Sequence, residues 1–125
     1  MAKVLVIDDD SALRRIVNRV LTKAQHEVIE AENGIEGIRK FKSENPEIVI
    51  MDIVMPHQDG IQTIQEIRDV VGDKTGVIAI SGGGVGAGAL YLSIARELGA
   101  DAIVQKPFRP DDLVSTVEKV LNREN

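Results

Sequence analysis

Residues 47–52 read Glu-Ile-Val-Ile-Met-Asp, and this short stretch decides the class of fold. Four apolar residues in a row, from Ile48 to Met51, favour a strand that is buried on both faces. Such strands are typical of a parallel sheet that helices cover on both sides. The run ends in a carboxylate, Asp52, and acidic side chains are rarely buried without a partner. The stretch therefore predicts a covered parallel sheet and marks Asp52 as a candidate functional residue.

On both sides of this stretch, further apolar runs alternate with helical patterns. Strands are predicted at residues 3–7, 27–31, 47–51, 77–80 and 102–104. The apolar stripes of five helices are predicted from residues spaced three or four apart: Leu13, Ile16, Val17, Val20 and Leu21; Ile35, Ile38 and Phe41; Ile61, Ile64, Ile67 or Arg68, and Val71; Leu90, Ile94, Ala95 and Leu98; Leu113, Val117, Val120 and Leu121. Ser11 is expected to cap the first helix, and the second should stop before Pro46. The alternation predicts a doubly wound α/β domain with right-handed crossovers.

Composition narrows the class of protein. A chain of 125 residues with 43 % hydrophobic residues suits one globular domain. The absence of cysteine excludes disulfides and thiolate chemistry. No apolar run is long enough for a signal peptide or a membrane span, so we expect a soluble, cytoplasmic protein. A formal charge of −5 argues against a nucleic-acid-binding surface and favours a local site for a cation.

Polar residues follow four of the five predicted strands at the point where each of these four ends. Asp8-Asp9-Asp10 follow the first strand, Asp52 the third, Ser81 the fourth, and Gln105-Lys106 the fifth. Parallel strands bring their carboxyl ends to one edge of the sheet, where ligands of open α/β folds bind. If strands one and three are neighbours, several carboxylates meet there, repel one another and raise each other's pKa values. A divalent cation would remove that conflict.

Four segments resemble the motifs of receiver domains of response regulators in two-component signalling. They are VLVIDDDS (4–11), IVIMDIVMPHQDG (48–60), IAISGG (78–83) and IVQKPF (103–108). The resemblance covers the whole chain in the family's order and spacing, so residues 1–125 are expected to form one receiver domain. It implies a flavodoxin-like (βα)5 fold, with a five-stranded parallel sheet of order 2-1-3-4-5 and helices on both faces.

The resemblance also implies roles for individual residues. Asp52 is similar to the family's phosphoacceptor, which attacks phosphorus as a carboxylate nucleophile. Asp8 and Asp9 resemble the acidic pair that, with Asp52 and the backbone carbonyl of Val54, holds Mg²⁺ or Mn²⁺.

Three further matches complete the expected site. Ser81 stands where the family has a hydroxyl that contacts a phosphoryl oxygen, and Lys106 where it has its lysine. Pro107 matches a cis-proline position. At Ile103 this chain departs from the family, because many receivers carry an aromatic residue there. We therefore expect the moving part to be the glycine-rich loop 82–88 and the start of the fourth helix.

The implied function is a signalling switch rather than an enzyme that acts on other molecules. It would accept a phosphoryl group from a histidine kinase or a histidine phosphotransfer protein, catalysing only its own phosphorylation and dephosphorylation. The response would be a changed protein-binding surface, with no direct contact to nucleic acid or membrane. The output, and whether the chain acts alone or as part of a longer protein, stay open.

Three other functions fit parts of the sequence, and the third of them involves no chemistry. A haloacid-dehalogenase-type phosphatase would use the Asp-x-Asp pattern of residues 8–10, but it leaves Asp52 unused. A dinucleotide-binding domain would use Gly84 to Ala89, but it needs an acid where Gln105 and Lys106 stand. An unphosphorylated pseudo-receiver would lack Asp9, Asp52 or Lys106, but all three are present. Asp10 is expected only to cap a helix, and no role is assigned to His26 or His57.

Overall fold

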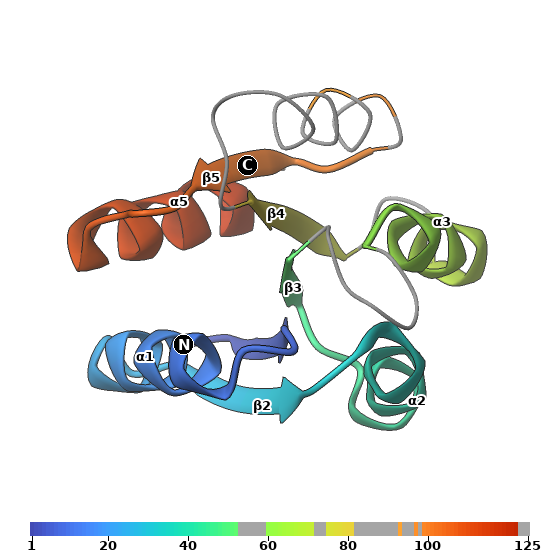
Figure 1. Ribbon diagram of the computed structural model, residues 1–125, viewed down its shortest axis with the longest axis horizontal. Coiled ribbons are helices and arrows are strands. Elements are labelled where there is room, and N and C mark those ends of the chain that lie inside the picture. The colour runs from blue at the N-terminus through green and yellow to red at the C-terminus, as the bar shows by residue number, and fades with distance from the viewer. Residues whose placement is uncertain (53–59, 72–74, 82–92, 94–96, 98, 123–125) are drawn as a thin grey trace.

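The computed structural model describes residues 1–52, 60–71, 75–81, 93, 97 and 99–122 (Figure 1). Within these residues, strands and helices alternate along the chain. The elements are β1 (Lys3–Ile7), α1 (Ser11–Lys23), β2 (Glu27–Ala31), α2 (Gly34–Glu44), β3 (Ile48–Asp52), α3 (Gly60–Val71), β4 (Gly76–Ser81), β5 (Ala102–Gln105) and α5 (Pro110–Leu121). The predicted fourth helix and the glycine-rich loop 82–88 lie almost wholly outside the described residues.

The five strands form one parallel sheet in the order β2-β1-β3-β4-β5, which confirms the predicted flavodoxin-like topology. In the register of the sheet, Ile7 pairs with Met51, Asp52 with Ile80, and Ser81 with Gln105. The carboxyl ends of β1, β3, β4 and β5 therefore lie side by side along one edge. This register brings the polar residues that follow the strands into one region.

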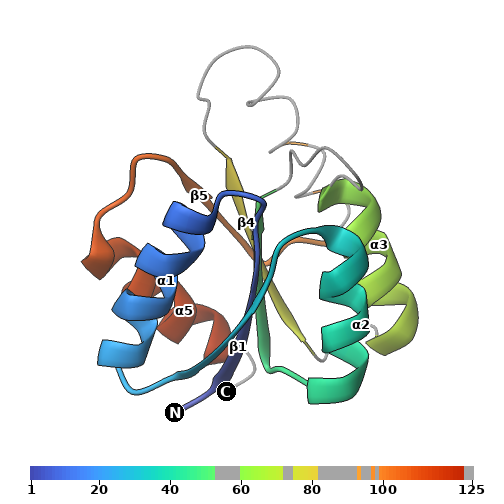
Figure 2. The same cartoon turned by 60° about the horizontal axis from the view of Figure 1, so that its bottom comes forward.

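Two apolar layers hold the helices against the sheet, because neighbouring residues of a strand point to opposite faces. Helices α1 and α5 cover one face, and α2 and α3 cover the other (Figure 2). The α1/α5 layer contains Val4, Val6, Val17, Leu21, Ile48, Ile50, Ile78, Ile80, Val104, Leu113, Val117 and Val120. The α2/α3 layer contains Leu5, Ile7, Ala31, Phe41, Val49, Met51, Ile67, Val77 and Ala79. Burial on both faces explains why the central strands are continuously apolar.

The structure corrects several local predictions. β3 runs one residue further than predicted and includes Asp52, and β4 and β5 also extend beyond their predicted ends. Ser11 is not the cap of α1: the carboxylate of Asp10 accepts the free N–H groups of the first turn, as predicted for that residue. Ile16 and Ile35, counted in the apolar stripes, are 52 % and 63 % exposed because they lie beside the buried faces of their helices. Among the described helices, none is both long and apolar enough to cross a membrane.

Candidate functional site

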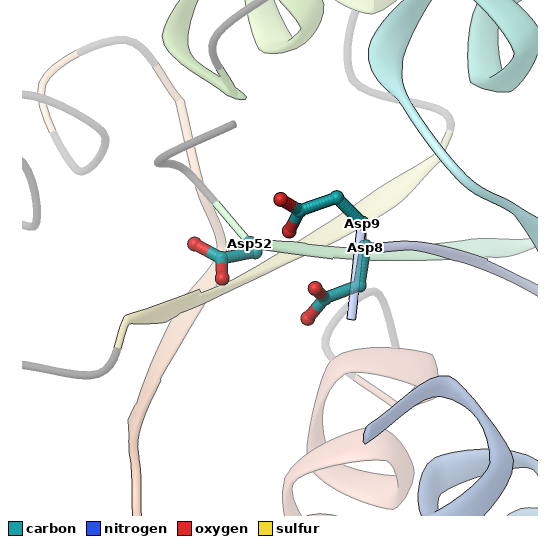
Figure 3. A group of neighbouring side chains, drawn as sticks. All are labelled: Asp8, Asp9 and Asp52. Atoms are coloured by element: carbon teal, nitrogen blue, oxygen red, sulfur yellow. The ribbon is translucent and has the colours of Figure 1, made fainter. Parts of the chain in front are cut away.

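Three aspartates gather where β1 and β3 end. Asp8 follows β1 and is buried, Asp52 is the buried last residue of β3, and Asp9 is exposed. One carboxylate oxygen from each lies within 4.8 Å of the others. Figure 3 shows their side chains grouped at the carboxyl edge of the sheet. In the described part of the chain, this is the one cluster of three acidic or histidine side chains close enough to share a metal ion.

The loop that follows β1 is held by its own aspartates. A carboxylate oxygen of Asp8 accepts the N–H of Asp10 at 2.9 Å. Asp10 in turn accepts the N–H groups of Ala12 and Leu13 at 3.0 and 3.2 Å. These bonds satisfy amide groups that a helix start leaves unpaired, so α1 begins directly after the acidic residues. Asp10 is used as a helix cap and lies outside the three-aspartate cluster.

Lys106, which follows β5, joins the site from the other side. Its Nζ donates to Oδ2 of Asp52 at 3.0 Å and lies 3.7 Å from Oδ2 of Asp8. Burial lowers the pKa of Lys106, but the hydrogen bond to Asp52 and the negative charges of the nearby aspartates outweigh it and raise the pKa above its usual value. The ammonium group is therefore a fixed positive charge. The Lys106–Pro107 peptide bond is cis, as the resemblance implies.

Burial, and to a smaller extent the neighbouring aspartates, favour the protonated form of Asp8 and raise its pKa. Burial, the charge of Asp52 and a contact with Asp9 raise the pKa of Asp8 from 3.8 to about 6. The N–H of Asp10 and the charge of Lys106 oppose that rise without cancelling it. The three carboxylates together offer hard oxygen ligands of the kind that Mg²⁺ prefers. A bound cation would also offset the repulsion that contributes to the raised pKa of Asp8.

Some predicted site residues can be placed only in part. Ser81 ends β4, one position beyond the residue that pairs with Asp52, but its side chain is not among those described. The carbonyl of Val54 lies outside the described residues, as does His57, to which no role is assigned. Ile103 is partly buried and packs against the α2/α3 layer.

Two residues of interest were missed by sequence reasoning. Arg14 of α1 donates from Nη1 to the backbone carbonyl of Asp8 at 2.6 Å. His26, to which no role was assigned, is buried and bonds the N–H of Ala2 and the carboxylate of Glu118. Neither contact has a sequence signal of its own, because each partner is set by how helices pack on the sheet.

The fold and the cluster define a doubly wound α/β domain with an acidic site at the carboxyl edge of its sheet. A family model described as the response regulator receiver domain matches residues 4–118. The chain belongs to this family, whose members are signalling switches of two-component systems.

Known proteins similar to this chain include both short and longer regulators. The chemotaxis protein CheY of Thermotoga maritima is 37 % identical over 119 residues, which cover 94 % of this chain and 96 % of that protein. The probable transcriptional regulator ycf27 of Pyropia yezoensis is 37 % identical over 121 residues, which cover 97 % of this chain but 48 % of that protein. The chain thus spans about half the length of some curated relatives. A crystal structure of a response regulator receiver domain protein from Clostridium thermocellum aligns with a TM-score of 0.91 at 29 % identity, covering 99 % of this chain and 97 % of that one.

Proposed function

We propose that the protein is a phosphorylation switch in which Asp52 accepts a phosphoryl group from a histidine kinase or a histidine phosphotransfer protein. One observation carries the proposal: carboxylate oxygens of Asp8, Asp9 and Asp52 lie within 4.8 Å of one another, with the Lys106 ammonium 3.0 Å from Asp52. Membership of the receiver family supports it. The new charge then alters a protein-binding surface.

Asp8, Asp9 and Asp52 would hold Mg²⁺ or Mn²⁺, together with the carbonyl predicted at Val54. The acidic oxygens fit such an ion, since they are crowded and only partly neutralised by Lys106. When bound, the ion neutralises charge on the phosphoryl oxygens and on the carboxylates. The residues of the chain supply the nucleophile, the ligands and the ammonium group.

In the proposed reaction, Asp52 is the nucleophile and Lys106 and Ser81 bind the phosphoryl oxygens. A carboxylate oxygen of Asp52 attacks the phosphorus of a phosphohistidine, an O–P bond forms, and the P–N bond breaks. The electron pair stays on the imidazole nitrogen of the donor. Lys106 is placed to follow the negative charge onto the phosphoryl oxygens, since it already bonds Asp52. Ser81, at the end of the neighbouring strand, is proposed to donate a hydrogen bond to one of those oxygens.

The proposed setting is the cytoplasm, and the proposed partners are proteins. The formal charge of −5 supports the proposal that the protein does not bind nucleic acid or membrane directly, because these attract basic surfaces. Beyond its own phosphorylation and dephosphorylation, no catalysis is proposed.

The test is phosphorylation by a small donor. We expect the wild type to gain one phosphoryl group from acetyl phosphate in the presence of Mg²⁺, as measured by intact mass, and to gain none with EDTA. Asp52→Asn should gain none, whereas Asp69→Asn, which alters an exposed aspartate of α3, should behave as the wild type. Phosphorylation of Asp52→Asn at the wild-type level would refute the proposal.

A further inference from the structure

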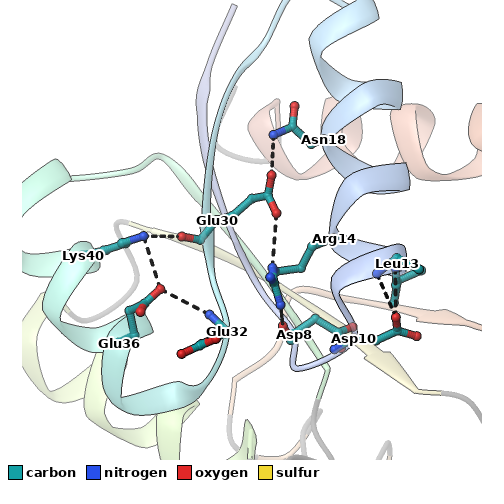
Figure 4. Close-up of polar contacts among 10 residues, drawn as sticks. Asp8, Asp10, Leu13, Arg14, Asn18, Glu30, Glu32, Glu36 and Lys40 are labelled. Atoms are coloured by element: carbon teal, nitrogen blue, oxygen red, sulfur yellow. Dashed lines mark hydrogen bonds and ion pairs between the residues drawn. The ribbon is translucent and has the colours of Figure 1, made fainter.

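Both main-chain polar groups of Asp8 are hydrogen-bonded, one to β2 itself and the other to Arg14, which pairs with Glu30 of β2. Its N–H donates to the carbonyl of Ala31 at 3.1 Å. Its carbonyl accepts Nη1 of Arg14 at 2.6 Å, and Nε of the same guanidinium donates to Oε1 of Glu30 at 3.2 Å. Figure 4 shows Arg14 between Glu30 and the turn that carries the acidic residues. The placement of Asp8 therefore depends on a side chain that is not itself part of the acidic cluster.

The Arg14 side chain is held rigidly enough to define a position. It is 16 % exposed, and its planar guanidinium bonds two acceptors at once, which fixes its orientation. The second oxygen of Glu30 accepts Nδ2 of Asn18 at 2.7 Å, so both oxygens of that carboxylate are in use. Lys40 of α2 donates to the backbone carbonyl of Glu30. The contact thus ties α1, β2 and α2 to the loop after β1.

Because the Glu30 carboxylate pairs with it, Arg14 contributes geometry more than charge to the site. The peptide whose carbonyl Arg14 binds is the one that joins Asp8 to Asp9, so its orientation sets where the Asp9 side chain begins. Without the guanidinium, this carbonyl would lose the hydrogen bond that orients it, and the Asp9 side chain would no longer start from a fixed position beside Asp8.

We propose that Arg14 is a positioning residue of the acidic site: by binding the Asp8 carbonyl while paired with Glu30, it holds Asp8 and Asp9 in the arrangement that binds a divalent cation. The inference rests on the proposed function, but it concerns metal binding and can be tested without phosphorylation. Groups that orient metal ligands commonly affect metal affinity about tenfold or more when they are removed.

The sign of the effect separates positioning from simple charge. Removing a positive charge near a cation site should strengthen Mg²⁺ binding or leave it unchanged. Loss of a positioning group should weaken it. Arg15→Ala is the matched control, because Arg15 is an exposed neighbour on the same helix and carries the same charge. Arg14→Lys keeps the charge but cannot bond both acceptors with one rigid fork.

The experiment is a Mg²⁺ titration in which binding is followed by amide NMR shifts. Urea unfolding in the same buffer first establishes that each variant is folded. We expect Arg14→Ala and Arg14→Lys to bind Mg²⁺ about tenfold more weakly than the wild type, and Arg15→Ala to stay within about twofold. In the metal-free Arg14 variants, the ¹⁵N resonance of Asp9 should shift, because its nitrogen belongs to the peptide that Arg14 binds. If Arg14→Ala does not fold, Arg14→Lys decides the matter.

Two results would overturn the inference, and they differ in what else they affect. Wild-type Mg²⁺ affinity in the folded Arg14 variants would show that Arg14 only stabilises the fold, leaving the proposed function intact. Failure of the wild type to bind Mg²⁺ would overturn the proposed function and this inference together.

Discussion

Replacing Asp8 by asparagine should stabilise the metal-free protein at pH 8. The Asp8 side chain is 3 % exposed, and burial and its acidic neighbours raise its pKa from 3.8 to about 6. Asparagine has nearly the same shape, and its carbonyl oxygen can still accept the N–H of Asp10. The substitution therefore removes an unfavourable buried charge while it keeps the hydrogen bond that orders the loop.

The size and the sign of the effect follow from the two pKa values. A carboxyl group whose pKa is higher in the folded state binds its proton more tightly there, so the ionised form costs stability as pH rises through about 6. A pKa difference of about two corresponds to about 3 kcal/mol, which is the upper limit of the gain at pH 8. Below the ordinary value of 3.8, Asp8 is protonated in both states, and the gain should vanish.

Urea unfolding followed by far-ultraviolet circular dichroism, with EDTA and at pH values from 5 to 8, measures this gain. Asp69→Asn is the control, and its free energy of unfolding should stay within about 0.5 kcal/mol of the wild type, as for most surface substitutions. Saturating Mg²⁺ should stabilise the wild type more than Asp8→Asn, because the variant has lost a carboxylate ligand. An Asp8→Asn protein that is no more stable than the wild type at pH 8 would refute the reasoning.

Three further predictions test other residues of the structure. Lys106→Ala should still bind Mg²⁺ but respond poorly to beryllofluoride, which mimics the phosphoryl group; an undiminished set of NMR shifts would contradict this. Gly37→Ala should lower the free energy of unfolding by about 1–3 kcal/mol, because the new Cβ would lie 2.8 Å from Cγ1 of the buried Ile7; urea unfolding measures the loss, and a gain would contradict it. His26→Ala should cost about 2–4 kcal/mol in the same assay, since it empties a buried site and removes the bonds to Ala2 and Glu118; Glu118→Gln, which can keep a bond, should cost less.

The fold could be predicted because each central strand carries its own signal. Continuous apolar runs such as Val4 to Ile7 and Ile48 to Met51 require cover on both faces, and both runs are completely or almost completely buried in the structure. The apolar stripes predicted where the helices lie in the sequence, but they did not predict exactly which residues of each helix are buried. Ile16 and Ile35 were misassigned because the buried stripe of a helix is narrower than the set of apolar residues near it.

The site residues that lie at the ends of strands could be predicted from the sequence. The contacts that depend on how a helix packs against the sheet could not. Asp8, Asp9, Asp52 and Lys106 each follow or end a strand, so the parallel topology alone brings them to one edge. The Arg14 contact with the Asp8 carbonyl depends on the angle at which α1 crosses the sheet. That angle is set by side chains far apart in the sequence, and no local pattern contains it.

The position of Lys106 indicates which side of the site should respond to phosphorylation in the proposed switch. The three aspartates carry three negative charges and Lys106 one positive charge, so a divalent cation brings the formal charge of the group to zero.

Conversion of the Asp52 carboxylate to an acyl phosphate adds up to about one negative charge at the end of β3. Among the contacts of the described residues, Lys106 is a cationic side chain that bonds Asp52, and we expect it to follow that charge. Because Lys106 directly follows β5 and Phe108 packs against the α1/α5 layer, the pull acts on the segment between β5 and α5. Asp8, fixed through its carbonyl by Arg14, stays where the cation needs it. We therefore expect the new charge to pull on the segment after Lys106, as well as on the predicted moving part at loop 82–88, while Arg14 holds Asp8 in place.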